Sequence, residues 1–320
     1  MQSRRTFLKG GALGAAALAV PATQGCVGMG KIRAKAPLQP RPLKKAVVLW
    51  YSQTGYTQRA GQLLAKTFEK KGAIVVAAEI REIDLEQIAE ADLIVLGSPV
   101  FYYDTPAYVK SWIKSMPDIS DVAVASFVTF GGPEGNQHNA ACSILDALVQ
   151  RGGIPVGINS FVNMSAWPLG LGDEKNESKY LQRWKLPDAD SYQRMREYAL
   201  LLKNKVEQGQ AAEFEKTLTM REVSTLLGPI WWTKRMIKNH SINKDKCIEC
   251  GACVEKCPVD AIDLTRFEVD TKSCVLCFGC INNCPAQAVH MEYSGKALIG
   301  YLEYKQQRKL EVTLPAELKG

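Results

Sequence analysis

The sequence predicts an α/β protein, with a doubly wound, five-stranded parallel sheet followed by a small α+β unit rich in cysteine. Two observations carry this prediction. Over residues 44–208, apolar runs that suit strands buried on both faces alternate with amphipathic helix patterns. Eight of the ten cysteines lie between Cys247 and Cys284. At 320 residues, the chain has room for one domain of good size and a smaller one.

The alternation of strands and helices can be followed along the first unit. The first strand is expected over 46–51, a continuous apolar run. Further strand patterns lie at 73–79, 92–97, 122–130 and 154–162. Helix patterns lie at 60–68, 85–90, 106–116, 139–151 and 192–206. Because helices separate the strands, each connection can cross over the sheet, and the strands are expected to be parallel.

Three loops at the carboxyl ends of the expected strands carry unusual residues, and open parallel sheets bind ligands at that edge. Residues 52–57 combine three Ser and Thr hydroxyls and a glycine at the start of a helix, where N–H groups and the helix dipole favour a phosphate. A plain turn with a helix cap is the alternative interpretation. Residues 97–106 are rich in aromatic side chains, and residues 130–136 in glycine. Together the three loops suit a flat ring with a phosphate tail.

The three loops and the order of strands and helices resemble the flavodoxin family over about residues 44–208. The resemblance implies that the cofactor is FMN. The phosphate ligands that it implies are Ser52, Thr54, Gly55 and Thr57, together with the backbone of Gln53 and Tyr56. The residues that it implies around the ring are Pro99, Val100, Phe101, Tyr102, Tyr103, Gly131 and Gly132. Residues 164–190 form an insert relative to a short flavodoxin; its Trp167 and Trp184 are candidates to cap the flavin, with ordinary packing as the favoured interpretation.

The clustered cysteines form two runs of identical spacing, C-x2-C-x2-C-x3-C-P. The runs are Cys247, Cys250, Cys253 and Cys257 before Pro258, and Cys274, Cys277, Cys280 and Cys284 before Pro285. Three thiolates on one tight loop can reach three corners of an iron–sulfur cube. The segments that follow the runs, 258–264 and 285–291, continue the repeat, which indicates an internal duplication.

This pattern resembles the bacterial ferredoxins that hold two [4Fe–4S] clusters, in which the fourth cysteine of each run binds the other cluster. The resemblance implies two ligand sets. One is Cys247, Cys250, Cys253 and Cys284, and the other is Cys274, Cys277, Cys280 and Cys257. Zinc sites and disulfides are the alternatives. The complete order of segments resembles a family of fused electron-transfer flavoproteins.

The N-terminal segment has the features of an export signal. Arg4 and Arg5 precede an apolar run over residues 10–20, which is too short to span a membrane. The segment resembles a twin-arginine signal, which implies export of an already folded protein to the periplasm or the outer face of the cytoplasmic membrane. Two interpretations of the end of the signal stay open: cleavage near Pro21, or a lipid anchor at Cys26.

The composition is that of an ordinary globular protein, with 46% hydrophobic and 23% charged residues. The formal charge is +7, and three of the basic residues lie in the signal, so no nucleic-acid partner is expected. Basic residues concentrate over 31–45 and 221–244. Beside the second concentration, the apolar stretch 226–232 has two interpretations: packing between the two units, which is favoured, or contact with a membrane surface.

The expected domain organisation has six parts. They are a signal at 1–30, a linker at 31–43, the flavodoxin-like domain at 44–208, a connecting segment at 209–240, the ferredoxin-like domain at 241–293 and a C-terminal extension at 294–320, in which no chemistry is recognised.

The expected function is that of an exported protein passing electrons between FMN and two [4Fe–4S] clusters, with redox proteins or a small-molecule acceptor as partners. No catalytic acid or base is assigned. One alternative is a flavin-dependent reductase that reacts with NAD(P)H or a quinone, although no G-x-G-x-x-G follows a strand. The other alternative is an exported binding module stapled by disulfides and without cofactors.

Overall fold

The computed structural model of the protein describes residues 27–88, 90–132, 136–172, 183, 185–218 and 229–319. The twin-arginine motif, Cys26 and Trp184 lie outside these residues. Within the described ranges, no helix has both the length and the apolar character needed to cross a membrane.

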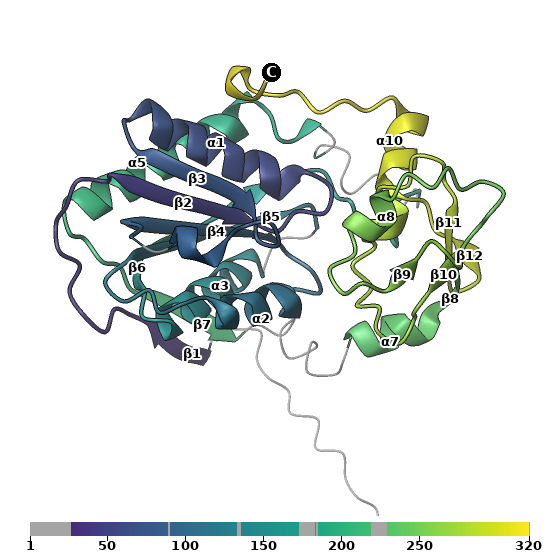
Figure 1. Cartoon of the computed structure of the whole chain (residues 1–320), viewed down its shortest axis with the longest axis horizontal. Coiled ribbons are helices and arrows are strands. Elements are labelled where there is room, and N and C mark those ends of the chain that lie inside the picture. The colour runs from purple at the N-terminus through teal and green to yellow at the C-terminus, as the bar shows by residue number, and fades with distance from the viewer. Residues whose placement is uncertain are drawn as a thin grey trace, which may run out of the picture.

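Five parallel strands form the central sheet, in the order β3–β2–β4–β5–β6 (Figure 1). In chain order they are β2 (Lys45–Trp50), β3 (Ile74–Glu79), β4 (Leu93–Pro99), β5 (Ala123–Phe130) and β6 (Ile154–Val162). Strands β2, β4 and β5 are buried almost throughout, as their continuous apolar runs indicate. The expected α/β class with a doubly wound parallel sheet is confirmed. Because β3 and β4 lie on opposite sides of β2, the topological switch point lies between β2 and β4.

Helices cover both faces of this sheet (Figure 1). One face packs against α1 (Tyr56–Lys70) and α5 (Ala189–Glu207), and the other against α2 (Ala107–Ser115) and α3 (Gln137–Gln150). The short turn η1 (Leu85–Ile88) lies between β3 and β4. Each helix in the described residues of this unit lies within a few residues of its expected place. Pro106, expected as the first residue of its helix, is instead the cap that precedes α2.

A second, two-stranded sheet lies beside α3. Strand β1 (Val27–Ile32) pairs antiparallel with β7 (Phe214–Leu218), and the side chain of Asn139 on α3 is hydrogen-bonded to the backbone of Thr217. Strand β1 crosses the expected boundary between signal and linker, and β7 falls within the expected connecting segment. Leu38 and Leu43 of the expected linker are buried in the core. The sequence pattern indicated neither strand.

The cysteine-rich unit is a small α+β fold, as expected. Its larger sheet has the order β12–β11–β8, and its smaller one pairs β9 with β10. The strands are β8 (Ile237–Ile242), β9 (Ile262–Asp263), β10 (Glu268–Val269), β11 (Val289–Tyr293) and β12 (Lys296–Ala297). Two one-turn helices, α8 (Ala252–Glu255) and α9 (Gly279–Asn282), begin at the same point of the two cysteine runs, so the sequence repeat is also a structural repeat.

Helix α7 (Pro229–Met236) precedes the cysteine-rich unit. The favoured sequence interpretation placed its apolar residues between the two units. That interpretation is wrong for Ile230, Trp231 and Trp232, because these side chains are 41%, 56% and 56% exposed.

The C-terminal segment returns from the second unit to the first (Figure 1). Helix α10 (Tyr301–Arg308) packs beside α9, and the turn η3 (Ala316–Leu318) packs on α1. Glu317 accepts two hydrogen bonds from Arg196 on α5, at 2.9 and 3.0 Å, and these bonds lower the pKa of Glu317 to about 2. The segment, for which the sequence indicated no role, therefore joins the two units as a strap.

Candidate cofactor sites

A cavity of about 480 Å³ lies at the switch point of the sheet, within the size range of small-ligand sites. Loops after β2, β4, β5 and β6 form most of its walls. Twelve of the thirteen predicted flavin residues line this cavity: Ser52, Gln53, Thr54, Tyr56, Thr57, Pro99, Val100, Phe101, Tyr102, Tyr103, Gly131 and Gly132. The exception is Gly55. Residues that the sequence interpretation missed also line it, among them Thr129, Asn163, Ser165 and Tyr304.

Residues 52–57, in which the sequence predicts phosphate ligands, are called the phosphate loop; Gly55 shapes this loop without lining the cavity. Its φ of +85° is in the left-handed region that glycine adopts most easily, and α1 begins at the next residue. Tyr56 and Thr57, the first residues of α1, line the cavity. The first N–H groups of α1, which have no partner within the helix, therefore lie at the cavity wall.

Two polar atoms of the phosphate loop fit a bound anion. Ser52 and Gln53 are each only 6% exposed, and Ser52 Oγ and Gln53 Nε2 have no hydrogen-bond partner in the described protein. A buried polar atom without a partner is unfavourable by about 1–3 kcal/mol, so such atoms commonly mark a ligand. The hydroxyl of Thr57, in contrast, already has a partner: it is hydrogen-bonded to the hydroxyl of Thr129, at 2.8 Å.

The charge around the cavity is also unusual. Among the described residues, its lining contains no Asp, Glu, His, Lys or Arg. Just outside, the guanidinium of Arg59 lies over the ring of Tyr56, at 4.5 Å from the ring centre, and two of its nitrogens are buried without a partner. A phosphate here would be bound by hydroxyl and N–H groups, with Arg59 as a nearby counter-charge that the sequence interpretation missed.

Aromatic side chains form the wall that faces the second unit. Trp167 packs edge-to-face on Tyr102 and on Phe278, with ring centres 5.0 Å apart in both pairs. Trp167 also lines the cavity. The two interpretations of this residue, ordinary packing and a position from which it could cap a flavin, are therefore compatible. Tyr102 and Tyr103 have φ angles of +48° and +68°, a strained conformation for such residues that tends to occur at ligand sites.

The eight cysteines of the two runs surround two smaller cavities in the second unit. One cavity is lined by Cys247, Cys250, Cys253 and Cys284, and the other by Cys257, Cys274, Cys277 and Cys280. Each cavity thus takes three cysteines from one run and the last cysteine from the other, which is the grouping implied by the resemblance to ferredoxins. We call them the first and the second cysteine set.

Both sets suit an iron–sulfur cluster, because each brings four cysteines to the lining of one cavity, and all eight thiols are free. The repeat extends to the hydrogen bonds: Ala261 N–H donates to Cys257 Sγ and Ala288 N–H to Cys284 Sγ, both at 3.2 Å. Such donors stabilise thiolate charge. Burial raises the pKa of Cys277 to about 12, so its thiolate requires a strongly positive ligand.

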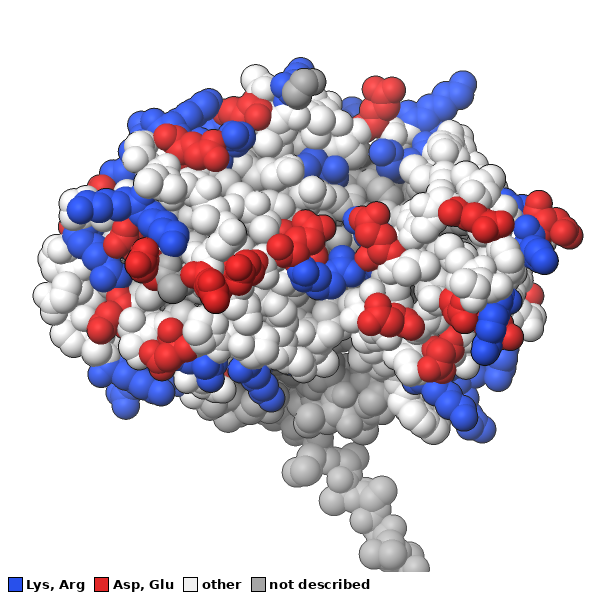
Figure 2. Space-filling model, in the orientation of Figure 1, with Lys and Arg blue, Asp and Glu red and all other residues white. Residues whose placement is uncertain are grey.

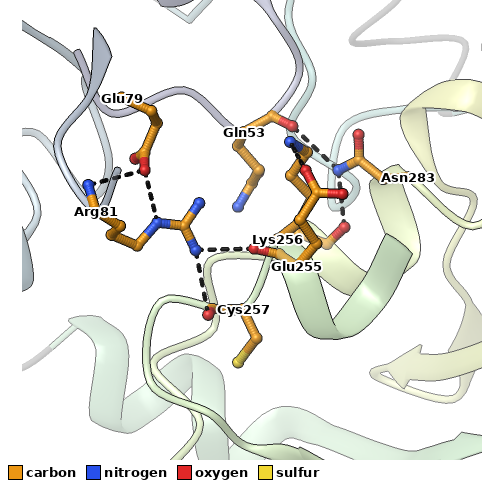
Figure 3. Close-up of polar contacts among 8 residues, drawn as sticks. Gln53, Glu79, Arg81, Glu255, Lys256, Cys257 and Asn283 are labelled. Carbon is orange, nitrogen blue, oxygen red and sulfur yellow. Dashed lines mark hydrogen bonds and ion pairs between the residues drawn. The ribbon is translucent and has the colours of Figure 1, made fainter. Parts of the chain in front are cut away.

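The two units are joined by polar contacts beside the cavity (Figure 3). Asn283, the residue before Cys284, donates to the backbone oxygen of Gln53 at 3.1 Å. Arg81 pairs with Glu79 at 2.9 Å and donates to the carbonyl of Glu255 at 2.8 Å and, at 3.5 Å, to that of Cys257. The first unit therefore contacts the second next to the two cysteines that cross between the sets.

One cysteine belongs to both kinds of site. Cys277 is a member of the second set, and of the eight cysteines in the two runs it alone lines the cavity at the switch point. The hydroxyl of Tyr102 lies 3.5 Å from the carbonyl oxygen of the preceding residue, Leu276. The second set therefore adjoins the proposed flavin cavity, whereas the first set, with Cys250 exposed, lies closer to solvent.

Comparisons with known proteins agree with this geometry. Residues 48–184 match the model of the flavodoxin family, residues 240–263 the 4Fe–4S binding domain, and residues 1–21 the signal sequence of the twin-arginine translocation pathway. No curated protein matches the chain at a significant level.

Similar solved structures include a flavodoxin from the domain Archaea, with 16% sequence identity and a TM-score of 0.39, and flavodoxin 2 from Bacillus cereus, with 17% identity and a TM-score of 0.39. Each match covers 51% of this chain and 99% of the other chain. Another is the rubredoxin oxygen:oxidoreductase of Desulfovibrio gigas, with 16% sequence identity and a TM-score of 0.39; the match covers 54% of this chain and 38% of that one. The three family models match different parts of the chain: most of the first folded unit, the part of the second unit that holds the first cysteine run, and the N-terminal segment. The protein is thus a fusion of a flavodoxin domain and a 4Fe–4S ferredoxin domain behind a twin-arginine signal sequence.

Proposed function

We propose that this protein is an exported electron carrier that binds one FMN and two [4Fe–4S] clusters. The observation that carries the proposal is the position of Cys277, which lines the cavity at the switch point and belongs to the second cysteine set. A flavin in that cavity and a cluster on that set would share one wall. FMN exchanges electrons singly or in pairs and each cluster exchanges one, so their combination links two-electron and one-electron partners.

The chain's own residues hold this arrangement in place. The contact of Asn283 with Gln53 ties the second unit to the phosphate loop. Trp167 packs between Tyr102, which lines the cavity, and Phe278, which lines the second cysteine set, so its side chain connects the two sites. The exposed Cys250 of the first set offers the side at which a redox protein or a small-molecule acceptor would exchange electrons.

A reductase that adds hydride and a proton to its substrate needs a positioned proton donor. In the described lining, the side chains that could donate a proton include the hydroxyl of Tyr102, whose pKa burial raises, which makes it a weaker acid. The proposed electron carrier needs no such donor. The twin-arginine signal is compatible with this function, because a receptor-read signal of this kind can follow cofactor insertion in the cytosol.

Cofactor content and electron flow test the proposal. Purified without oxygen, the protein should contain about eight irons and eight sulfides, with one FMN. On rapid mixing with a reduced one-electron carrier protein, too large to enter the cavity, cluster absorbance should change before flavin absorbance. In Cys274→Ala, flavin should stay bound but its reduction should slow by about tenfold or more. Cys142→Ala, which removes a buried cysteine of α3 outside both sets, is the matched control.

Two results would overturn the proposal. One is a protein without FMN, in which case the flavodoxin domain would be a scaffold only. The other is flavin reduction at an unchanged rate in Cys274→Ala, which would show that electrons reach the flavin without the second set.

A further inference from the structure

Helix α7 carries the densest group of exposed apolar side chains in the described part of the protein. Ile230, Trp231, Trp232 and Met236 are 41%, 56%, 56% and 41% exposed, and all four lie within eight residues. The rings of Trp231 and Trp232 meet edge-to-face with centres 4.8 Å apart. A soluble monomer rarely exposes such a cluster without a binding role.

Basic side chains surround this group. An open groove of about 510 Å³ runs beside α7, and its described lining contains no carboxylate and four Lys or Arg residues: Lys234, Arg235, Lys238 and Lys272. The guanidinium of Arg235 lies over the Trp231 ring, at 5.8 Å from its centre. Figure 2 shows Lys and Arg side chains at the lower right rim of the molecule, where Figure 1 places α7. The surface of α7 and its groove is therefore both aromatic and cationic.

We propose that this surface docks the protein on an anionic lipid bilayer. Trp231, Trp232 and their apolar neighbours would enter the boundary between headgroups and acyl chains, where tryptophan is enriched. The basic residues of the groove would bind headgroup phosphates. At eight residues α7 is far too short to span a bilayer, so the docking is to one surface.

Charge and location favour lipid over other occupants. A second copy docked through the same face would oppose its basic groove to an identical one, and like charges across an interface are unfavourable. The twin-arginine signal brings the chain to a membrane and across it, so a lipid surface is the first large partner available on the far side. The inference does not depend on the proposed redox function, although Cys274 lines the same groove and would come to lie on the docked side.

Binding to vesicles tests the proposal with the exported, cofactor-loaded protein, so that all variants share the same N-terminus. Co-sedimentation with vesicles of phosphatidylcholine and phosphatidylglycerol should exceed that with phosphatidylcholine alone by about tenfold or more, and added salt should reduce it. The double variant Trp231→Ser, Trp232→Ser should lose about tenfold or more of this binding. Ile74→Ser, which removes a 72% exposed apolar side chain from β3, should not change it.

Unchanged visible spectra would show that both variants keep their fold and cofactors. The proposal is overturned if the double variant binds anionic vesicles as well as the parent. It is also overturned if the parent binds neutral and anionic vesicles equally, or if the double variant abolishes a concentration-dependent dimer while vesicle binding is absent. That last outcome would assign the surface to a second copy of the chain.

Discussion

Replacing Ser52 by alanine separates the binding of a phosphate from the stability of the fold. Ser52 Oγ is buried and has no partner in the described protein, so a bound FMN phosphate would accept its hydrogen bond. A hydrogen bond to a charged group contributes about 1.5–3 kcal/mol, so Ser52→Ala should weaken FMN about ten- to hundredfold. In the FMN-free protein the same change removes an unsatisfied hydroxyl. The free energy of unfolding should therefore stay the same or rise.

Ser126 provides a matched control with the opposite expectation. It is also a buried serine, in β5, but its hydroxyl donates to the carbonyl of Ala141 at 2.8 Å and does not line the cavity. Ser126→Ala leaves that buried carbonyl without this donor, so it should lower the free energy of unfolding by about 1–3 kcal/mol. FMN affinity should stay unchanged.

Quenching of flavin fluorescence on titration of the FMN-free protein measures the affinities, and denaturant unfolding of the same protein measures the stabilities. Riboflavin, which lacks the phosphate, should bind the Ser52→Ala variant and the parent equally well. The reasoning is refuted if Ser52→Ala weakens FMN and riboflavin by the same factor. It is equally refuted if the variant is as destabilised as Ser126→Ala, because the hydroxyl would then serve the fold.

Three further changes test other parts of the structure. Cys257→Ala should halve the iron content and, under native anaerobic conditions, expose the other three cysteines of the second set to alkylation, as mass spectrometry would show; labelling of the first set instead would contradict the crossed grouping. Lys replacement of both Arg4 and Arg5 should leave folded, coloured protein in the cytosol, and fractionation of cells checks this; continued export would count against the twin-arginine route. Arg81→Met should speed hydrogen exchange in residues 255–257 while iron content stays the same, whereas Lys66→Met, on an exposed ion pair of α1, should leave that exchange unchanged.

The central sheet could be predicted closely because its signal is local. Val47, Val48 and Leu49 are fully buried on both faces of β2, so the run has no polar interruption, and the helix pattern follows directly after a short loop. The phosphate loop and the cysteine runs are local in the same sense. Each is a chemical group held by one short stretch of chain, and its spacing is visible without knowledge of the fold.

Strands β1 and β7 had no such signal. The stretch from Val27 to Ile32 contains two glycines and a lysine, and its partner strand lies almost two hundred residues away. Their pairing depends on α3, where Asn139 bonds to β7, and on burial of Ile32 in the core of the adjoining face. A strand that is stable only when it packs on an already folded domain needs no regular pattern of apolar residues in its own sequence.

The contacts between the two units could not be predicted from the sequence, because they too join residues far apart in the chain. They also connect the two kinds of cofactor site. Gln53 was expected to serve only the phosphate, and Asn283 is a polar residue within a cysteine run. In the folded chain, Asn283 donates to the carbonyl of Gln53, next to Cys284 of the first cysteine set. A ligand that orders Gln53 therefore also favours the docked position of α9, and a cluster that orders α9 favours the binding-competent phosphate loop. Because such coupling between two binding equilibria is reciprocal, loading of either cofactor should promote loading of the other by the same factor.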